Sequence, residues 1–180
     1  MRRLPVLFAT LLLSGCAGMM QSSTTDNTAA AEIKDASGRT VGTANLTQLG
    51  SAVRIVMQVR GVPPGVKGVH IHEVGKCEGP SFNSAGNHFN PGGRQHGALN
   101  PQGSHAGDLP NLTVAGDGTG RLETTTEQIS LVTGPSALSD ANGSALVIHA
   151  APDDFRTDPT GNSGARIACG VITKSDGPRR

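Results

Sequence analysis

The chain has 180 residues, the size of a single domain with one hydrophobic core, so a second domain is not expected. Trp and Tyr are absent while Gly and Pro are frequent, and a core of Val, Ile, Leu and Ala between many turns favours short strands over helices. The formal net charge is +1. Removing residues 1–15, which hold two arginines and no acid, leaves 13 basic against 14 acidic residues, or −1. This balance shows no nucleic-acid-binding footprint, and we expect no nucleic-acid partner.

The first 30 residues indicate export rather than a folded segment. Arg2 and Arg3 precede the apolar run LPVLFATLLL, which is too short to span a bilayer, and small residues follow it. The sequence LSGC resembles the bacterial lipobox, which predicts a signal peptide at 1–15 and a lipid on Cys16. An ordinary secretory peptide is the alternative. Residues 16–30 are small and polar, and we expect a flexible tether there.

Cysteine usage agrees with an oxidising compartment outside the cytoplasm. Three cysteines in such a compartment would leave one without a disulfide partner. Lipidation of Cys16 would leave only two cysteines, which can pair. Cys77 and Cys169 can then form a disulfide, with two buried free thiols as the alternative. Ala17 after Cys16 resembles lipoproteins of the outer membrane, so we expect a periplasmic, lipid-anchored protein at that membrane rather than the inner one.

Short stretches with alternating or β-branched residues begin at about Ala31. They cover 31–36, 39–49, 52–61, 66–74, 111–116, 120–126, 129–132 and 144–150. Turn sequences such as DASG and SDANG separate them, which is typical of an antiparallel sandwich or barrel. Two stretches rich in Gly, Pro, Asn and Asp, 75–110 and 151–168, interrupt this pattern. Because the first holds three of the six histidines, we expect functional loops.

The histidines are spaced as metal ligands. His70 and His72 lie two residues apart in a predicted strand, and therefore on one face with Cα atoms roughly 6.5–7 Å apart. A chance pair on a solvated face is the alternative for this motif alone. His149 at the end of another strand would supply a third nitrogen, and imidazole-rich tetragonal sites favour copper(II).

A second group follows in the long loop. His88, His96 and His105 are separated by eight and nine residues, and Asp108 comes three residues later. Three imidazoles and one carboxylate meet the tetrahedral preference of zinc and leave no open position, as in a structural zinc site. Binding of the metal would offset the entropy lost in ordering the loop. Polar loop histidines without a metal are the alternative.

Together, HIHEVGKC, SAGNHFNPGGRQHG, SHAGDLPNL, VIHA followed by DD, and GARIACGVI resemble the copper/zinc superoxide dismutases of the bacterial exported branch, from about Ala31 to Thr173. The resemblance implies an all-β Greek-key sandwich or flattened barrel, immunoglobulin-like, with eight strands and two long functional loops. The domain would cover 31–175, with a disordered tail at 176–180.

The resemblance also implies a site for copper and zinc. His70, His72, His88 and His149 match the copper ligands, and His88, His96, His105 and Asp108 match the zinc ligands, so His88 would bridge the metals. Asp153 matches a carboxylate that joins a copper-bound and a zinc-bound histidine, although it could be a surface acid. Cys77 and Cys169 match the intrachain disulfide of the family.

The implied reaction converts superoxide to dioxygen and hydrogen peroxide at a redox-cycling copper, with His88 returning a proton, and would protect the cell envelope. Arg166 matches an arginine at the mouth of the copper channel, where its charge would hold the anion. A lysine expected in the late loop is missing; APDDFRTDPTGNSGAR has Arg156 and several aspartates instead.

Two other functions fit the same fold. A lipoprotein that binds copper and zinc for storage or delivery would lack a ligand or the channel arginine, whereas this chain has residues at all of these positions. A purely structural lipoprotein with a zinc staple would leave His70, His72 and His149 without a role. A homodimer is possible, but no self-complementary surface can be recognised in the sequence.

Overall fold

The computed structural model describes residues 27–175. The predictions of a signal peptide at 1–15, of a lipid on Cys16 and of a disordered tail at 176–180 concern residues outside this range. Between residues 27 and 175, no helix is long and apolar enough to cross a membrane.

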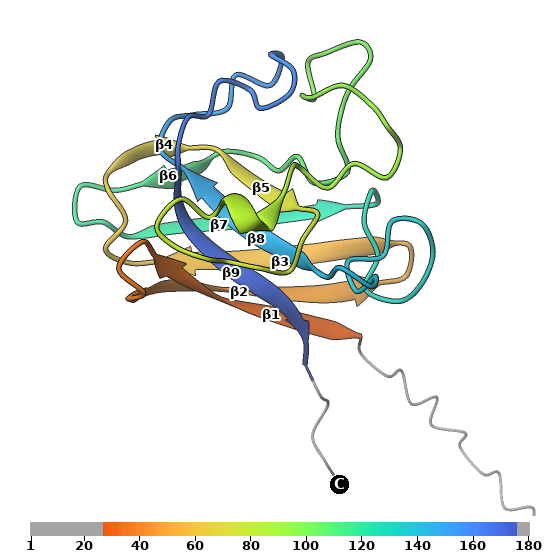
Figure 1. Ribbon diagram of the computed structural model, residues 1–180, viewed down its shortest axis with the longest axis horizontal. Helices are drawn as coiled ribbons and strands as arrows, with labels where there is room; N and C mark the ends of the chain where they lie inside the picture. Colours follow the sequence, from red (N-terminus) through yellow and green to blue (C-terminus); the bar gives the residue numbers. More distant parts are fainter. Residues whose placement is uncertain (1–26, 176–180) are drawn as a thin grey trace, which may run out of the picture.

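The described residues form nine strands and one short 3-10 helix (Figure 1). The strands are β1 (Thr28–Asp35), β2 (Thr40–Leu49), β3 (Ala52–Val59), β4 (Gly65–Lys67), β5 (Val69–His72), β6 (Leu112–Val114), β7 (Gly120–Thr126), β8 (Ser144–His149) and β9 (Arg166–Lys174), and the helix η1 is Asn83–Ala85. The sheet order is β4-β6-β7-β3-β2-β1-β9-β8-β5, and all strand pairs are antiparallel. Because the two edge strands β4 and β5 are consecutive in the chain, the sheet curls into a flattened barrel.

The predicted all-β class is confirmed. Nine strands form rather than eight, because 66–74 is divided in two and β9 adds a strand outside the predicted stretches, whereas 129–132 forms none. The segment 66–74 is divided at Gly68. The Gly68 N–H group donates to the Ala151 carbonyl at 2.8 Å, and its own carbonyl accepts the His149 N–H group at 2.9 Å. A Cβ atom at Gly68 would lie 2.8 Å from the Ser163 Cβ atom, so only glycine permits this close approach.

Alternation of apolar and polar residues builds the core. In β3, Val53, Ile55 and Met57 are buried while Arg54 and Gln58 are exposed. In β5 and β8 every residue is buried, because loops cover their outer faces. The inward side chains of these two strands join the main core, and the outward Ala145 and Val147 form a second cluster with Phe82, Ala85, Cys77 and Cys169.

Two details of the predicted layout are wrong. The predicted tether at 16–30 ends too late, because Thr28 to Ala30 belong to β1 and pair with β2. These residues are too small to give a hydrophobic pattern, although Ala29 is buried. The stretch 129–132 is not a strand; Ile129 and Leu131 are buried, but the segment makes only an isolated bridge from Ser130 to Ala137.

Two long loops contain many of the predicted site residues. The long loop, residues 73–111, joins β5 to β6, and the late loop, residues 150–165, joins β8 to β9. Parts of both loops lie together above the barrel in Figure 1, where the Leu99 N–H group donates to the Phe155 carbonyl at 2.9 Å. The predicted disulfide between Cys77 and Cys169 is present and fastens the long loop to β9.

Candidate metal centre

The free edge of β5 orders the long loop. The Ile71 N–H group donates to the Gly107 carbonyl at 2.9 Å, and the Ile71 carbonyl accepts the Phe89 N–H group at 2.8 Å. Isolated bridges pair His70 with Asp108 and His72 with His88. The strand that carries two histidines therefore brings loop residues 88 and 108 into the same site.

The first group contains His70, His72, His88 and His149. One ligand atom from each lies within 4.8 Å of those of the others, and all four side chains are buried. The ring centroids of His70 and His149 are 4.8 Å apart, and those of His72 and His88 are 5.0 Å apart. The β5–β8 pairing explains the approach of His149, because it aligns Val69 with Ile148.

In this group the unpaired nitrogens are the ones that face a common centre. His70 Nδ1, His72 Nε2, His88 Nε2 and His149 Nε2 are buried and have no hydrogen-bond partner. The opposite nitrogens do have partners: His72 Nδ1 donates to the Gly86 carbonyl at 3.0 Å, and His149 Nδ1 donates to the Gly164 carbonyl at 3.1 Å. These bonds fix the tautomers and leave a lone pair on each inward nitrogen. Buried unpaired nitrogens are costly unless a ligand takes them, so this donor set fits a copper ion.

The second group has the dimensions of a tetrahedral zinc site. Nδ1 of His96, His88 and His105 lie 3.0, 3.2 and 3.4 Å from Asp108 Oδ1. His105 Nδ1 is also 3.4 Å from His88 Nδ1. Ligands bonded to zinc at about 2.0–2.1 Å in a tetrahedron are separated by about 3.3–3.4 Å. The other oxygen of Asp108 accepts the Gly97 and His105 N–H groups at 2.9 and 3.0 Å, which fixes the carboxylate.

His70 also lies near this second group, within 4.8 Å of ligand atoms of His88, His96 and Asp108. Its Nε2, however, donates to Asp153 Oδ2 at 2.9 Å, and its Nδ1 belongs to the first group. His105 Nδ1 rather than a nitrogen of His70 is therefore positioned to complete the second group.

His88 belongs to both groups through opposite edges of one ring. Its Nδ1 lies among the zinc-type atoms, while its Nε2 lies among the copper-type atoms without a partner. The His70 and His88 ring centroids are only 3.9 Å apart. One imidazole can therefore contact two ions.

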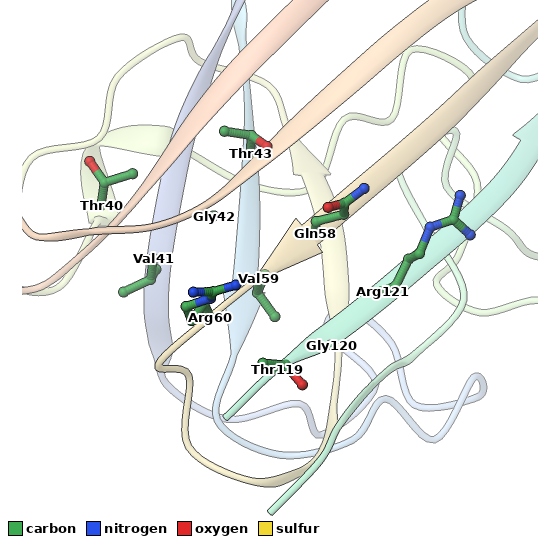
Figure 2. A pocket seen from close by; sticks show the side chains of 10 residues that line it. All are labelled: Thr40, Val41, Gly42, Thr43, Gln58, Val59, Arg60, Thr119, Gly120 and Arg121. Atoms are coloured by element: carbon green, nitrogen blue, oxygen red, sulfur yellow. The ribbon is translucent and has the colours of Figure 1, made fainter. Parts of the chain in front are cut away.

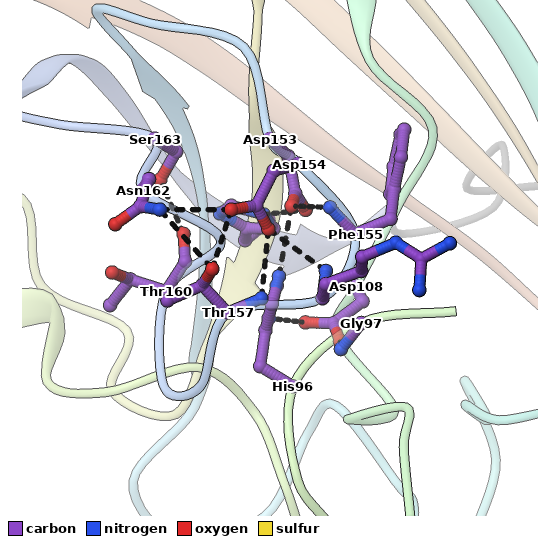
Figure 3. Close-up of polar contacts among 12 residues, drawn as sticks. His96, Gly97, Asp108, Asp153, Asp154, Phe155, Thr157, Thr160, Asn162 and Ser163 are labelled. Atoms are coloured by element: carbon purple, nitrogen blue, oxygen red, sulfur yellow. Dashed lines mark hydrogen bonds and ion pairs between the residues drawn. The ribbon is translucent and has the colours of Figure 1, made fainter. Parts of the chain in front are cut away.

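Asp153 connects the two groups through hydrogen bonds to one histidine of each, and Figure 3 shows its contacts with His96 and Phe155. Its Oδ2 accepts His70 Nε2–H at 2.9 Å, and its Oδ1 accepts His96 Nε2–H at 3.0 Å and the Phe155 N–H group at 2.6 Å. A Cβ atom at Gly161, which has φ of 62°, would lie 1.9 Å from Asp153 Oδ1, so a larger residue would displace this contact.

Sequence reasoning missed the residue that holds Asp153. The Asn111 side chain accepts the Asp153 N–H group and donates to the Asp153 carbonyl, both at 2.9 Å. Asn111 directly precedes the buried start of β6, so it ties the bridging carboxylate to the barrel. The motif SHAGDLPNL contains Asn111, but nothing local to the sequence indicates a partner more than 40 residues away.

Burial keeps most of these histidines neutral. It lowers the pKa of His72 to about 2, of His149 to about 3 and of His88 to about 4, which leaves lone pairs free for metals at pH 7. Burial also opposes the charge of His96, but hydrogen bonds with Asp108 and Asp153 outweigh it and raise its pKa to about 9. The histidine hydrogen bonds hold the pKa of both carboxyls well below the usual range, although burial alone would raise it.

A cleft of about 350 Å³ leads to the histidines. Its lining includes His88, His105, Arg166 and Asp158. The Arg166 guanidinium donates to the Phe82 carbonyl at 2.7 Å and to the Gly86 carbonyl at 2.6 Å. Among residues 27–175 no carboxylate forms an ion pair with Arg166, so its charge is available to an anion in the cleft.

A larger hollow of about 520 Å³ lies elsewhere, over the ends of β2, β3 and β7 (Figure 2). Its lining includes Thr43, Gln58, Arg60 and Arg121, and it contains no histidine or carboxylate. The Arg121 guanidinium is paired with Glu123. The larger hollow therefore lacks metal-ligating side chains, whereas the smaller cleft contains His88 and His105 and is the candidate site.

The fold and the two joined histidine groups define a β-barrel protein with paired metal sites. The family model described as copper/zinc superoxide dismutase (SODC) matches residues 40–172. The chain belongs to this family, whose copper and zinc suit the two donor sets.

Relatives and solved structures agree. The chain is 43% identical over 169 residues to "Superoxide dismutase [Cu-Zn] 2" of Aquifex aeolicus, covering 93% of this chain and 96% of the relative. It is 39% identical to "Superoxide dismutase [Cu-Zn]" of Deinococcus radiodurans, covering 93% of each. A superoxide dismutase-like protein from Bacillus subtilis matches with a TM-score of 0.76 and 39% identity, covering 79% of this chain and 96% of that structure.

Proposed function

We propose that this chain disproportionates superoxide, with copper held by His70, His72, His88 and His149 and zinc held by His88, His96, His105 and Asp108. The balanced reaction joins two superoxide anions and two protons to give one dioxygen and one hydrogen peroxide. The observation that carries the proposal is the His88 ring, whose two nitrogens belong to different ligand groups. Copper, when bound, supplies the one-electron redox chemistry that this reaction needs.

The protein's own residues have three roles in this proposal. Arg166 binds the anion in the cleft, because its guanidinium is fixed by two carbonyls and keeps its charge. When Nε2 is not bound to copper, His88 can hold and donate a proton there, since Nδ1 anchors the ring on the zinc side. Asp153 keeps the His70 and His96 rings in orientation.

We also propose that the protein acts in the cell envelope, anchored by a lipid on Cys16 to the outer membrane. The support is the sequence alone: the short apolar run after Arg2 and Arg3 and the LSGC motif. Mass spectrometry of the membrane fraction tests this, and Cys16→Ala should move the protein into the soluble envelope fraction. Unmodified protein of full length in the cytoplasm would contradict the proposal.

The test of activity combines metal analysis with superoxide decay. The purified mature protein should bind one copper and one zinc and accelerate the decay. His88→Ala should lose roughly 100-fold or more in rate, the usual contribution of a proton donor, whereas Gln58→Ala on the outer barrel face should not. Two bound metals without decay would instead support the alternative, a lipoprotein for metal storage or delivery.

A further inference from the structure

In five of the six histidines, each ring nitrogen either faces into one of the two groups or forms a hydrogen bond outside it. The nitrogens that face away from the groups bond to Asp153 or to the carbonyls of Gly86 and Gly164, and both nitrogens of His88 point inward. His105 differs, because its Nε2 faces outward toward the cleft. The carboxylate that lies there is Asp158, with Oδ1 at 3.8 Å from His105 Nε2.

The same oxygen of Asp158 has a closer partner. It accepts the backbone N–H group of His96 at 2.6 Å. Asp158 lies in the late loop, whereas His96 and His105 lie in the long loop. One carboxylate oxygen therefore contacts two residues of the zinc-type group across the boundary between the loops.

We propose that Asp158 is a positioning residue with two opposite effects: it strengthens zinc binding by stabilising His96 and His105, and it slows the approach of superoxide through the cleft. The effect on zinc depends only on the chain's own ligand geometry. The effect on rate rests on the function proposed above.

The first effect follows from charge. A bound divalent cation makes the Nε2–H group of His105 a stronger donor. The negative charge of Asp158, 3.8 Å from that nitrogen, therefore stabilises the metal-bound ring. Partners of metal-bound histidines typically change metal affinity by 10–100-fold. The Asp158 side chain is 46% exposed, so solvent weakens the contact and we expect a change of about tenfold.

The second effect follows from the position of Asp158 in the cleft. Its carboxylate lines the same space as Arg166 and His88, and a negative charge there repels an anionic substrate. Arg94 and Glu73 also line the cleft. Arg94 donates to the Gly103 carbonyl, and Glu73, which accepts from Asn87, is a second carboxylate that repels an anion there. This assigns a physical role to an aspartate in a loop where a lysine was expected.

Asp158→Asn removes the negative charge but keeps the shape of the side chain, and its amide oxygen still accepts the His96 N–H group. Zinc affinity, measured by chelator competition on copper-free protein, should fall about tenfold. Asp158→Ala should fall further, since it also removes that acceptor. The superoxide decay rate of fully loaded Asp158→Asn should rise several-fold at low ionic strength, and the gain should vanish near ~0.5 M salt.

Glu73→Gln is the matched control, because it removes another carboxylate of the cleft that is bonded to Asn87 rather than to the zinc-type group. It should raise the low-salt rate without changing zinc affinity. Unchanged zinc affinity in Asp158→Asn would overturn the positioning role, and an unchanged low-salt rate in an active enzyme would overturn the repulsion. If the wild type showed no superoxide decay, the proposed function would fail while the zinc measurement would still decide the positioning role.

Discussion

Replacing Asp153 by Asn should weaken copper binding more than zinc binding. In the native site, Oδ1 accepts two N–H groups, from Phe155 and His96, whereas Oδ2 accepts only that of His70. An amide has one acceptor oxygen, and it should occupy the position that satisfies two donors. The amide NH₂ group then meets His70 Nε2–H, so two donors face each other in a buried site.

The magnitude follows from the lost bond. A hydrogen bond to a charged group contributes about 1.5–3 kcal/mol, and 1.4 kcal/mol corresponds to a factor of ten. Copper affinity should therefore fall about 10–100-fold, either through the unpaired donor or because His70 changes tautomer and protonates its Nδ1. His96 keeps its acceptor, so zinc affinity should change less, by the loss of charge alone.

Competition with a chelator for each metal measures both affinities. Asp154→Asn is the control, because the adjacent carboxylate is exposed and bonds within the late loop to Thr157 and Asn162. An equal or larger loss of zinc affinity would refute the placement of the amide. Unchanged affinity for both metals would refute the orienting role of Asp153 altogether.

Three further predictions concern stability and rate. Replacing both Cys77 and Cys169 by Ala should lower the free energy of unfolding by about 4–5 kcal/mol in urea titrations, because the disulfide spans 92 residues; a loss under 1 kcal/mol would contradict the chain-entropy argument. In the metal-free protein, the raised pKa of His96 adds stability that is complete below pH 6.5 and is lost as pH rises toward about 9. Urea titrations should find a decrease of up to about 3 kcal/mol across that window, and a flat profile would argue against a charged His96. Arg166→Ala should lower the superoxide decay rate with both metals retained, and an unchanged rate at low ionic strength would exclude its role in binding the anion.

Local patterns in the sequence were sufficient to predict the fold class, whereas the candidate site residues came from the ligand types together with the family resemblance. Alternation in β3 and β5, turn sequences between strands and the His-x-His spacing all act over a few residues. The same logic failed where the pattern was weak. Thr28 to Ala30 are too small to indicate a strand, and Ile129 and Leu131 are apolar because they pack into the core without being paired in the sheet.

The sequence by itself determined which residues can bind metals, since the ligand types and their order are properties of the chain. Only the tertiary structure decided which nitrogen of each ring is free, because that depends on hydrogen bonds to distant carbonyls such as Gly86 and Gly164. It also decided the roles of Asn111 and Asp158, whose partners lie more than 40 residues away. Loop residues meet through long-range backbone pairing, and no local pattern records which side chains that pairing brings together.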